Sequence, residues 1–201
     1  MTVRVEPGEI KEIIGKLRTR VAPGLDEIGN KIVKAAPETI STTMATIINA
    51  CLQQGVFPDA WKRARLITLL KGPNRDRSAM SSYRPVCLLS TLGKLFEKVL
   101  EVRIQGAANE DPRQFGFKQG RNTTNAIEEL TKYRESKEKH VVAIMLDISS
   151  AFDCIWWPSA LMAPKENNCP RDVYKVLQDY FRNREVVLQE GAFNRRRSQA
   201  R

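Results

Sequence analysis

Two aspartates follow an apolar run near the end of the chain. Residues 140–146 read HVVAIML, Asp147 comes next, and Asp153 stands six positions later. A run rich in β-branched residues suits a strand buried on both faces. A carboxylate buried there without a partner would be costly, so Asp147 must face a cleft, pair with a cation or bind metal. The alternative, that Asp147 lies in a turn and Asp153 caps a helix, stays open from residue chemistry alone.

A second candidate is a basic stretch between Trp61 and Arg84. It holds seven basic residues against one acid, a net of 7 − 1 = +6: Lys62, Arg63, Arg65, Lys71, Arg75, Arg77 and Arg84, with Asp76. A strand, a loop and an extended segment would bring Lys71 and Arg84 near each other. A lysine point charge beside a forked arginine donor suits phosphate groups. A solvated basic hairpin without a ligand is the alternative.

The third candidate is the loop QFGFKQGR, residues 114–121. Its glycines would let backbone approach a ligand closely. Lys118 and Arg121 stand just before a predicted helix, whose N-terminus attracts phosphate. Phe115 or Phe117 could stack on a base, or serve as core anchors of a tight loop.

Composition narrows the class of protein. A net charge of +10 over 201 residues suggests a polyanionic partner, with nucleic acid the first candidate and a merely basic protein the alternative. Four cysteines without a CxxC pair and a single histidine argue against zinc, and we expect no haem. We find no signal peptide and no membrane-spanning run, so we expect an intracellular protein of the nucleus or cytoplasm, neither secreted nor in a membrane.

Periodicity and breakers predict the elements that must position these residues. Helices are predicted over 7–18, from a cap at Asp26, over 37–55, after Ser90, and over 123–139, 151–162 and 171–181. Strands are predicted over 63–71, 83–89, 140–147 and 185–189. In the helix 123–139, the side chains expected to face inward are Ala126, Ile127, Leu130 and Tyr133. The mixture lacks a regular βαβ rhythm, so the fold class is α+β.

Four stretches then fall into a familiar order: APGLDEIGNKIVK, WKRARLITLLKGPNRDRSAMSSYRPVCLL, QFGFKQGRNTTNAI and VAIMLDISSAFDCIWW. Together they resemble the reverse transcriptase domain of non-LTR (LINE-type) retrotransposons. The later stretch CPRDVYKVLQDYFRNREVVL is similar to arthropod elements that insert into ribosomal RNA genes. The resemblance covers roughly residues 20–197.

The resemblance implies an RNA-directed DNA polymerase with a right-hand architecture. We therefore expect polymerase fingers plus a partial palm, an incomplete antiparallel palm sheet and no thumb. The implied divisions are an N-terminal helical extension over 1–19, a fingers-like region over 20–139, a partial palm over 140–190 and a disordered basic tail over 191–201. The implied partners are an RNA template, a DNA primer and dNTP.

Residue roles carry over by position. Asp147 matches the first metal-binding aspartate of the palm, and Ile148 would offer its backbone to Mg²⁺ or to the triphosphate. Phe152 matches the bulky residue that excludes a ribose 2′-hydroxyl, whereas Asp153 matches a structural position. Hard magnesium prefers carboxylate oxygens, which agrees with aspartate as the ligand.

The basic candidates also acquire roles from the resemblance. Lys71 and Arg84 match the fingers residues that clamp the incoming triphosphate. The loop matches one that touches template backbone, and its candidate contacts are Gln114, Gly116, Lys118, Gly120 and Arg121.

The sequence departs from the family in several places. It contains no Asp-Asp pair and no Gly-Cys-Pro-Gln-Gly-Ser type motif, both of which the family's palm carries. Glu27 stands where the family usually has glycine, so we expect strain in that turn. Three interpretations follow: a truncated polymerase that is inactive alone, a non-catalytic RNA or RNA–DNA binding module, and a nonfunctional remnant.

Overall fold

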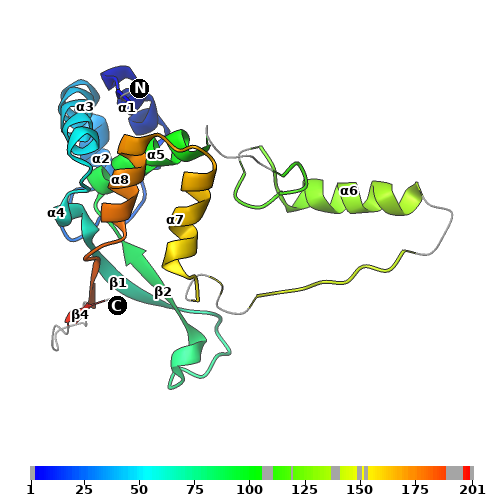
Figure 1. Cartoon of the computed structure of the whole chain (residues 1–201). Helices are drawn as coiled ribbons and strands as arrows, with labels where there is room; N and C mark the ends of the chain where they lie inside the picture. Colours follow the sequence, from blue (N-terminus) through cyan, green and yellow to red (C-terminus); the bar gives the residue numbers. More distant parts are fainter. Residues whose placement is uncertain are drawn as a thin grey trace.

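The computed structural model describes residues 3–105, 111–118, 120–136, 141–148, 151, 154–188 and 197–199. Helices and strands mix without βαβ order, which confirms the α+β class. Figure 1 shows a helical layer at one end of a small sheet, with helix α6 (Thr123–Glu135) reaching away from both.

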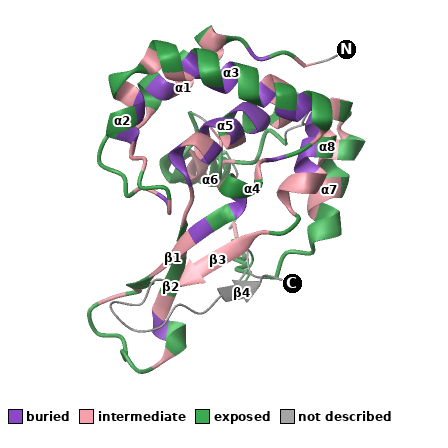
Figure 2. Cartoon of the chain, turned by 90° about the vertical axis from the view of Figure 1, so that its left-hand side faces the viewer, coloured by how far each residue is buried: buried purple, intermediate pink, exposed green. Residues whose placement is uncertain are grey.

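The helical layer contains the main core. Its elements are α1 (Pro7–Lys16), α2 (Asn30–Ala35), α3 (Pro37–Gln54), α4 (Asp59–Lys62), α5 (Thr91–Gln105), α7 (Trp157–Glu166) and α8 (Arg171–Tyr180). Each long helix turns an apolar stripe inward, as residues three and four apart must on one face. Buried side chains include Ile10, Ile48, Phe96 and Val176, each 0% exposed. The helices predicted over 7–18, over 37–55, after Ser90 and over 171–181 are therefore confirmed, and Figure 2 shows the buried positions of α1, α3, α5 and α8 turned toward one another.

Local signals set several helix ends. Gly55 ends α3 with φ +71°, a conformation that only glycine adopts without strain. The second helix begins at Asn30 and not at Asp26, since the Asp26 carboxylate accepts from the Ile28 amide and forms a turn instead. Helix α7 begins six residues later than predicted, at Trp157, with Pro158 in its first turn where a proline is tolerated.

The sheet has the order β2-β1-β3-β4. Strands β1 (Arg63–Leu70) and β2 (Tyr83–Leu88) pair antiparallel, but β1 and β3 (Glu185–Leu188) pair parallel, with Arg63 opposite Glu185. The described sheet is therefore mixed, whereas the resemblance implied an incomplete antiparallel palm sheet. Residues 197–199, expected to be disordered, form β4, which pairs antiparallel along the outer edge of β3.

The predicted strand over 140–147 is wrong for the residues that the structure describes. Residues 141–148 form neither helix nor strand, and Leu146 is 91% exposed. A strand needs a neighbour to complete its backbone hydrogen bonds, and this segment does not enter the four-stranded sheet. His140 lies outside the described residues.

Helix α6 differs from its prediction in burial. It ends at Glu135, and none of its described residues is buried. Ile127 and Tyr133, expected to face a core, are 63% and 56% exposed. Figure 1 shows why, since the body of the helix lies apart from the helical layer.

A buried lysine links α4 to α8. Lys62 is 2% exposed and donates from Nζ to Asp59 at 2.9 Å and to Asp179 at 2.8 Å. The same Asp179 carboxylate accepts from the Phe57 amide at 2.8 Å. Burial raises the pKa of Asp179, but the hydrogen bonds from Lys62 and Phe57 outweigh it, and the net pKa is lowered. Lys62 is thus a structural ion-pair residue and not part of an exposed basic surface.

Candidate nucleic-acid interface

The β1–β2 hairpin brings Lys71 and Arg84 to one face. Arg84 lies opposite Leu69, and the Lys71 amide donates to the Ser82 carbonyl at 2.8 Å, which extends the ladder. Opposite residues in an antiparallel pair share a face, and positions 69 and 71 alternate back to that same face. The predicted proximity of the two cations therefore follows from the register, and both side chains are exposed.

The loop that joins the strands is held by its own polar groups. The Lys71 ammonium donates to the Ser81 carbonyl at 2.8 Å, and the Tyr83 hydroxyl donates to the Arg77 carbonyl at 2.9 Å. Asp76 accepts from the Ser78 hydroxyl and amide, which lowers the pKa of Asp76. The one acid of this stretch therefore stays ionised at neutral pH, and the field of the hairpin is positive because its basic residues outnumber Asp76.

Four basic side chains besides Lys71 remain exposed on the stretch that sequence analysis singled out: Arg63, Arg75, Arg77 and Arg84. Arg63 pairs with Glu185 at 3.1 Å, so its charge is partly compensated. Arg65 is half-buried, and its Nε is a buried nitrogen with no hydrogen-bond partner in the described part of the chain. Arg75, Arg77, Lys71 and Arg84 therefore form the surface that we call the basic hairpin.

Residues 114–121, which we call the glycine loop, are braced by Arg121. Its guanidinium donates to the Pro112 carbonyl and to the Gln114 carbonyl, the latter at 3.1 Å, and stands 5.5 Å from the centre of the Phe115 ring. The Gln114 side chain donates to the Gly116 carbonyl at 3.0 Å. These bonds shape the loop from within, so Gln114 and Arg121 serve its conformation as well as any ligand.

Two left-handed residues shape the outer part of this loop. Phe117 has φ +60° and Gly120 has φ +77°. Phe117 is 91% exposed, so it is not a core anchor, whereas Phe115 is half-buried beneath Arg121. Lys118 donates to the Asp111 carbonyl at 3.2 Å. Hydrogen bonds from Arg113 hold the pKa of Asp111 at about 2, so this acid stays ionised beside Lys118.

The loop leads directly into α6. The Asn122 side chain accepts from the Asn125 amide at 3.0 Å, and the Asn125 side chain accepts from the Asn122 amide at 3.0 Å. This reciprocal cap uses one backbone donor of the first turn and fixes the entry of the chain into the helix. Backbone amides of that turn lie next to Gly120 and Arg121, which is the arrangement expected for a phosphate-contacting loop.

The palm-type candidates lie elsewhere. Asp147 and Ile148 stand on the exposed segment 141–148, with Ile148 75% exposed. Among the described residues, no hydrogen bond or ion pair joins Asp147 to Lys71 or Arg84. Phe152 and Asp153 lie outside the described residues.

The donor set around Asp147 can be compared with what a metal needs. In the part of the chain that the structure describes, no group of three His, Cys, Asp or Glu side chains could hold an ion. Mg²⁺ requires six ligands in near-octahedral geometry, and its protein sites share carboxylates with water and phosphates. The described residues alone therefore do not fit a complete magnesium site, although Asp147 has the right ligand chemistry.

Sequence reasoning missed several residues that position this surface. Lys62 was counted with the exposed basic residues but is buried against Asp179. Arg103, near the end of α5, forms a two-pronged ion pair with Glu9, at 2.8 and 2.6 Å. The sequence gives no signal for such pairs, because their members are 94 to 117 residues apart.

The family model described as "Reverse transcriptase (RNA-dependent DNA polymerase)" matches residues 71–200. This range contains the basic hairpin from Lys71 onward, the glycine loop and the segment with Asp147. No helix within the described ranges is long and apolar enough to cross a membrane.

Curated relatives come from retrotransposable elements of flies. The 115 kDa protein of the type-1 retrotransposable element R1DM of Drosophila melanogaster is 33% identical over 190 residues, covering 94% of this chain and 18% of that protein. The Pol polyprotein of the type-1 element R1 of Bradysia coprophila is 32% identical, with 90% and 18% covered. The RNA-directed DNA polymerase from mobile element jockey of Drosophila melanogaster is 32% identical, with 88% and 20% covered. The chain thus spans about a fifth of the length of these relatives.

Proposed function

Since this chain belongs to the reverse transcriptase (RNA-dependent DNA polymerase) family, we propose that it supplies the nucleotide- and template-contacting part of a retrotransposon polymerase. In this proposal the basic hairpin holds the triphosphate of the incoming dNTP through Lys71 and Arg84. The glycine loop contacts the backbone of the RNA template through Gly116, Lys118, Gly120 and the neighbouring Gln114 and Arg121. Residues 20–139 correspond to the fingers and 140–190 to part of the palm.

The register of the β1–β2 hairpin is the observation that carries this proposal. It turns an ammonium and a guanidinium to the same exposed face, two positions apart across an antiparallel pair. Lysine attracts a phosphate as a point charge and arginine as a fork, so the two can grip adjacent phosphate groups. Binding of a triphosphate needs positioned positive charge more than any covalent chemistry.

Asp147 is proposed as one carboxylate ligand of Mg²⁺, with the Ile148 backbone beside it and Phe152 excluding a ribose. Mg²⁺ would neutralise phosphate charge when bound. The sequence carries no Asp-Asp pair to complete a two-metal site, so we expect the 201-residue chain by itself to lack polymerase activity. A primer-extension assay with Mg²⁺, dNTP and an RNA template checks this; template-dependent extension would contradict it.

A binding experiment tests the proposed hairpin role. We expect Lys71→Ala and Arg84→Ala each to weaken dNTP binding, measured by equilibrium dialysis, by about tenfold, since each removes one charge-assisted contact. Lys31→Ala is the matched control, because Lys31 is exposed on α2 and its loss changes the net charge equally. If all three variants bind dNTP alike, the cations act only through net charge and the proposed site is wrong.

The second candidate function is binding of RNA or an RNA–DNA duplex without catalysis. The observation favouring it is that all four cations of the basic hairpin, Lys71, Arg75, Arg77 and Arg84, lie exposed on one loop and its flanking strands. Such binding falls steeply with salt, because phosphate contacts release counterions. A dNTP affinity that is unmeasurable, together with salt-dependent RNA binding that Lys118→Ala weakens, would favour this function over the first.

A further inference from the structure

Residues 3–6, which precede α1, form an extended segment that we call the strap. Val5 donates from its amide to the Asn49 side chain at 2.9 Å and accepts from the same side chain at 2.9 Å. Asn49 thereby completes both hydrogen bonds of one residue's backbone, as a neighbouring strand would. The Val5 side chain is 1% exposed, so the strap is also anchored in the core.

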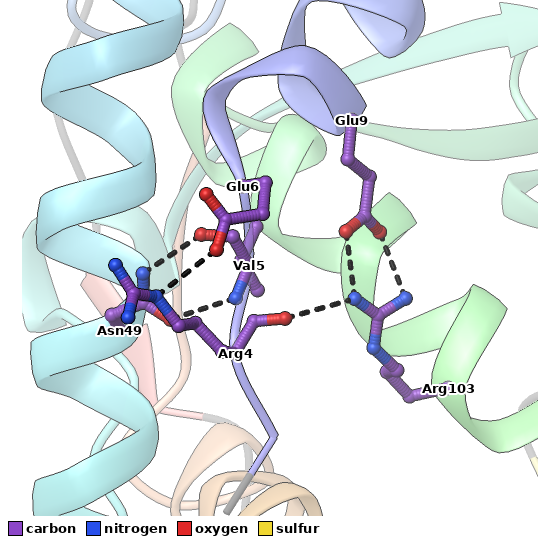
Figure 3. A network of polar contacts seen from close by, with 6 residues as sticks. All are labelled: Arg4, Val5, Glu6, Glu9, Asn49 and Arg103. Carbon is purple, nitrogen blue, oxygen red and sulfur yellow. Dashed lines mark hydrogen bonds and ion pairs between the residues drawn. The ribbon is translucent and has the colours of Figure 1, made fainter.

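An ion pair then links α1, the helix that follows the strap, to the end of α5. Figure 3 shows Arg103 reaching from α5 to both oxygens of Glu9 on α1 and to the Arg4 carbonyl of the strap. The two ion-pair distances, 2.8 and 2.6 Å, describe a two-pronged contact, and the side chains are only 23% and 27% exposed. Paired forks of this kind fix orientation as well as distance.

The same helices form a groove that reaches the glycine loop. The groove has a volume of about 760 Å³. Its apolar lining comes from Ile13 of α1, Leu17 directly after α1, Val102 of α5, and Phe117 of the glycine loop. Glu9 lines it too, so the ion pair with Arg103 stands beside a groove that the glycine loop also lines through Phe117.

We propose that the Glu9–Arg103 pair positions the glycine loop for its nucleic-acid contacts, with Asn49 holding the strap that leads into α1, the helix of Glu9. The contacts run from Asn49 to Val5 and from Glu9 to Arg103, and Glu9 and Phe117 line the same groove. Loss of the pair would loosen α1 from the end of α5 and so change the shape of the groove that Phe117 lines. Glu9 and Arg103 are therefore positioning residues that touch no ligand themselves. This inference rests on the proposed function of the glycine loop.

The negative charge of Glu9 allows one substitution to distinguish positioning of the loop from simple electrostatics. Glu9→Gln removes a negative charge, so simple electrostatics predict tighter binding to an RNA template. We expect the opposite, a weakening of about three- to tenfold in the dissociation constant, measured by fluorescence anisotropy on an RNA–DNA template–primer. Glu12→Gln is the matched control, since Glu12 lies on the same helix, is exposed and lines the same groove. If Glu9→Gln and Glu12→Gln bind equally well, the inference is wrong.

A charge exchange separates positioning from a general loss of structure. Arg103→Glu should weaken template–primer binding, and the double variant Glu9→Arg, Arg103→Glu should restore it to within about threefold, at unchanged net charge. Failure of the double variant to recover, with its thermal midpoint near that of the unaltered chain, would overturn the inference. Glu9→Asp, which keeps the charge and shortens the side chain, serves if Glu9→Gln does not fold.

Hydrogen exchange gives a readout that does not need nucleic acid. Amides of residues 111–118 should exchange faster in Glu9→Gln than in Glu12→Gln, while those of α8 stay unchanged. If Lys118→Ala and Arg121→Ala do not weaken template–primer binding, the proposed function of the loop is wrong. Faster exchange at 111–118 in Glu9→Gln would still support the positioning contact in that case, so the two failures are distinguishable.

Discussion

The helical core and the segment 141–148 are built from the same kinds of side chain and end in opposite environments. Val173 and Val176 of α8 are 0% exposed, whereas Val142 and Ile144 are 85% and 83% exposed. The valines of α8 meet α3 and α5 through a helical stripe that completes its own backbone hydrogen bonds. A strand cannot do so alone, and segment 141–148 has no partner within the described sheet. An apolar sequence is buried only where the fold supplies a matching surface.

The largest expected consequence of this difference concerns local opening. We expect amides of residues 174–177 to exchange with solvent at least about 10³-fold more slowly than those of residues 141–148, because the core opens only by global unfolding. Hydrogen exchange read by mass spectrometry measures both regions in one sample. Equal protection of the two regions would show that segment 141–148 finds a partner in solution.

Truncation of a core aromatic is the next largest effect. Phe96 is 0% exposed and stacks on Phe57 with ring centres 5.0 Å apart. Phe96→Ala should lower the free energy of unfolding by about 3–5 kcal/mol, since it removes buried area and leaves a cavity. Leu146→Ala, at a position 91% exposed, should change it by less than about 0.5 kcal/mol. Urea unfolding of the two variants compares the regions directly, and similar losses would refute the contrast.

Removal of the buried Lys62 should lower the free energy of unfolding by less than Phe96→Ala does. Lys62→Met leaves the Asp179 carboxylate without its ammonium, which should lower the free energy of unfolding by about 2–3 kcal/mol. Because hydrogen bonding lowers the pKa of Asp179, this contribution is present above the ordinary carboxyl value of 3.8 and is lost as pH falls through the lowered pKa.

The pH dependence that Lys62 contributes to stability runs in the opposite direction to that of Asp179. Burial disfavours the charged Lys62, but its hydrogen bonds and the charges of Asp179 and Asp59 outweigh this and raise its pKa. The contribution is therefore present below 10.5 and is lost as pH rises through the raised pKa. Urea titrations across pH should show a plateau in the difference between Lys62→Met and the unaltered chain. A difference that does not shrink at either extreme would argue against the ion pair.

The smallest effect concerns a single strained residue near the helical core. Glu27 has φ +58°, which confirms the strain expected where the family usually has glycine. Glu27→Gly should raise the free energy of unfolding by about 0.5–1 kcal/mol, because glycine adopts this conformation without steric cost. Glu27→Ala, which keeps the Cβ atom, should give no such gain. An equal gain from alanine would show that relief of the left-handed backbone strain is not the cause.

Sequence reasoning succeeded where a structure depends on nearby residues. The stripes of α1, α3 and α5 and the glycine that ends α3 are local signals, and the proximity of Lys71 and Arg84 follows from one hairpin. The fold beyond them depends on distant partners. Parallel pairing of Arg63 with Glu185 joins positions 122 residues apart, for which a single sequence carries no pattern.

Some parts of the candidate site could be predicted from the sequence, and others could not. The basic hairpin and the glycine loop were found because charge and glycine are visible in composition. The burial of Lys62 was not, since a lysine next to a strand reads as exposed until its acid partner is known. The exposure of Asp147 depends on which strands flank its segment, and that information lies outside the local sequence.

The parallel pairing of β1 with β3 also bears on how the chain folds during synthesis. The core draws on Val5 near one end and on Leu177 near the other, and the buried lysine needs Asp179. At roughly 5–20 residues per second, a ribosome takes on the order of ten seconds or more to pass from the first of these to the last. Folding dominated by such distant contacts is slow once the chain is complete. The parts of α3 and α5 that α8 covers therefore stay exposed during that interval, which makes the nascent chain a substrate for chaperones.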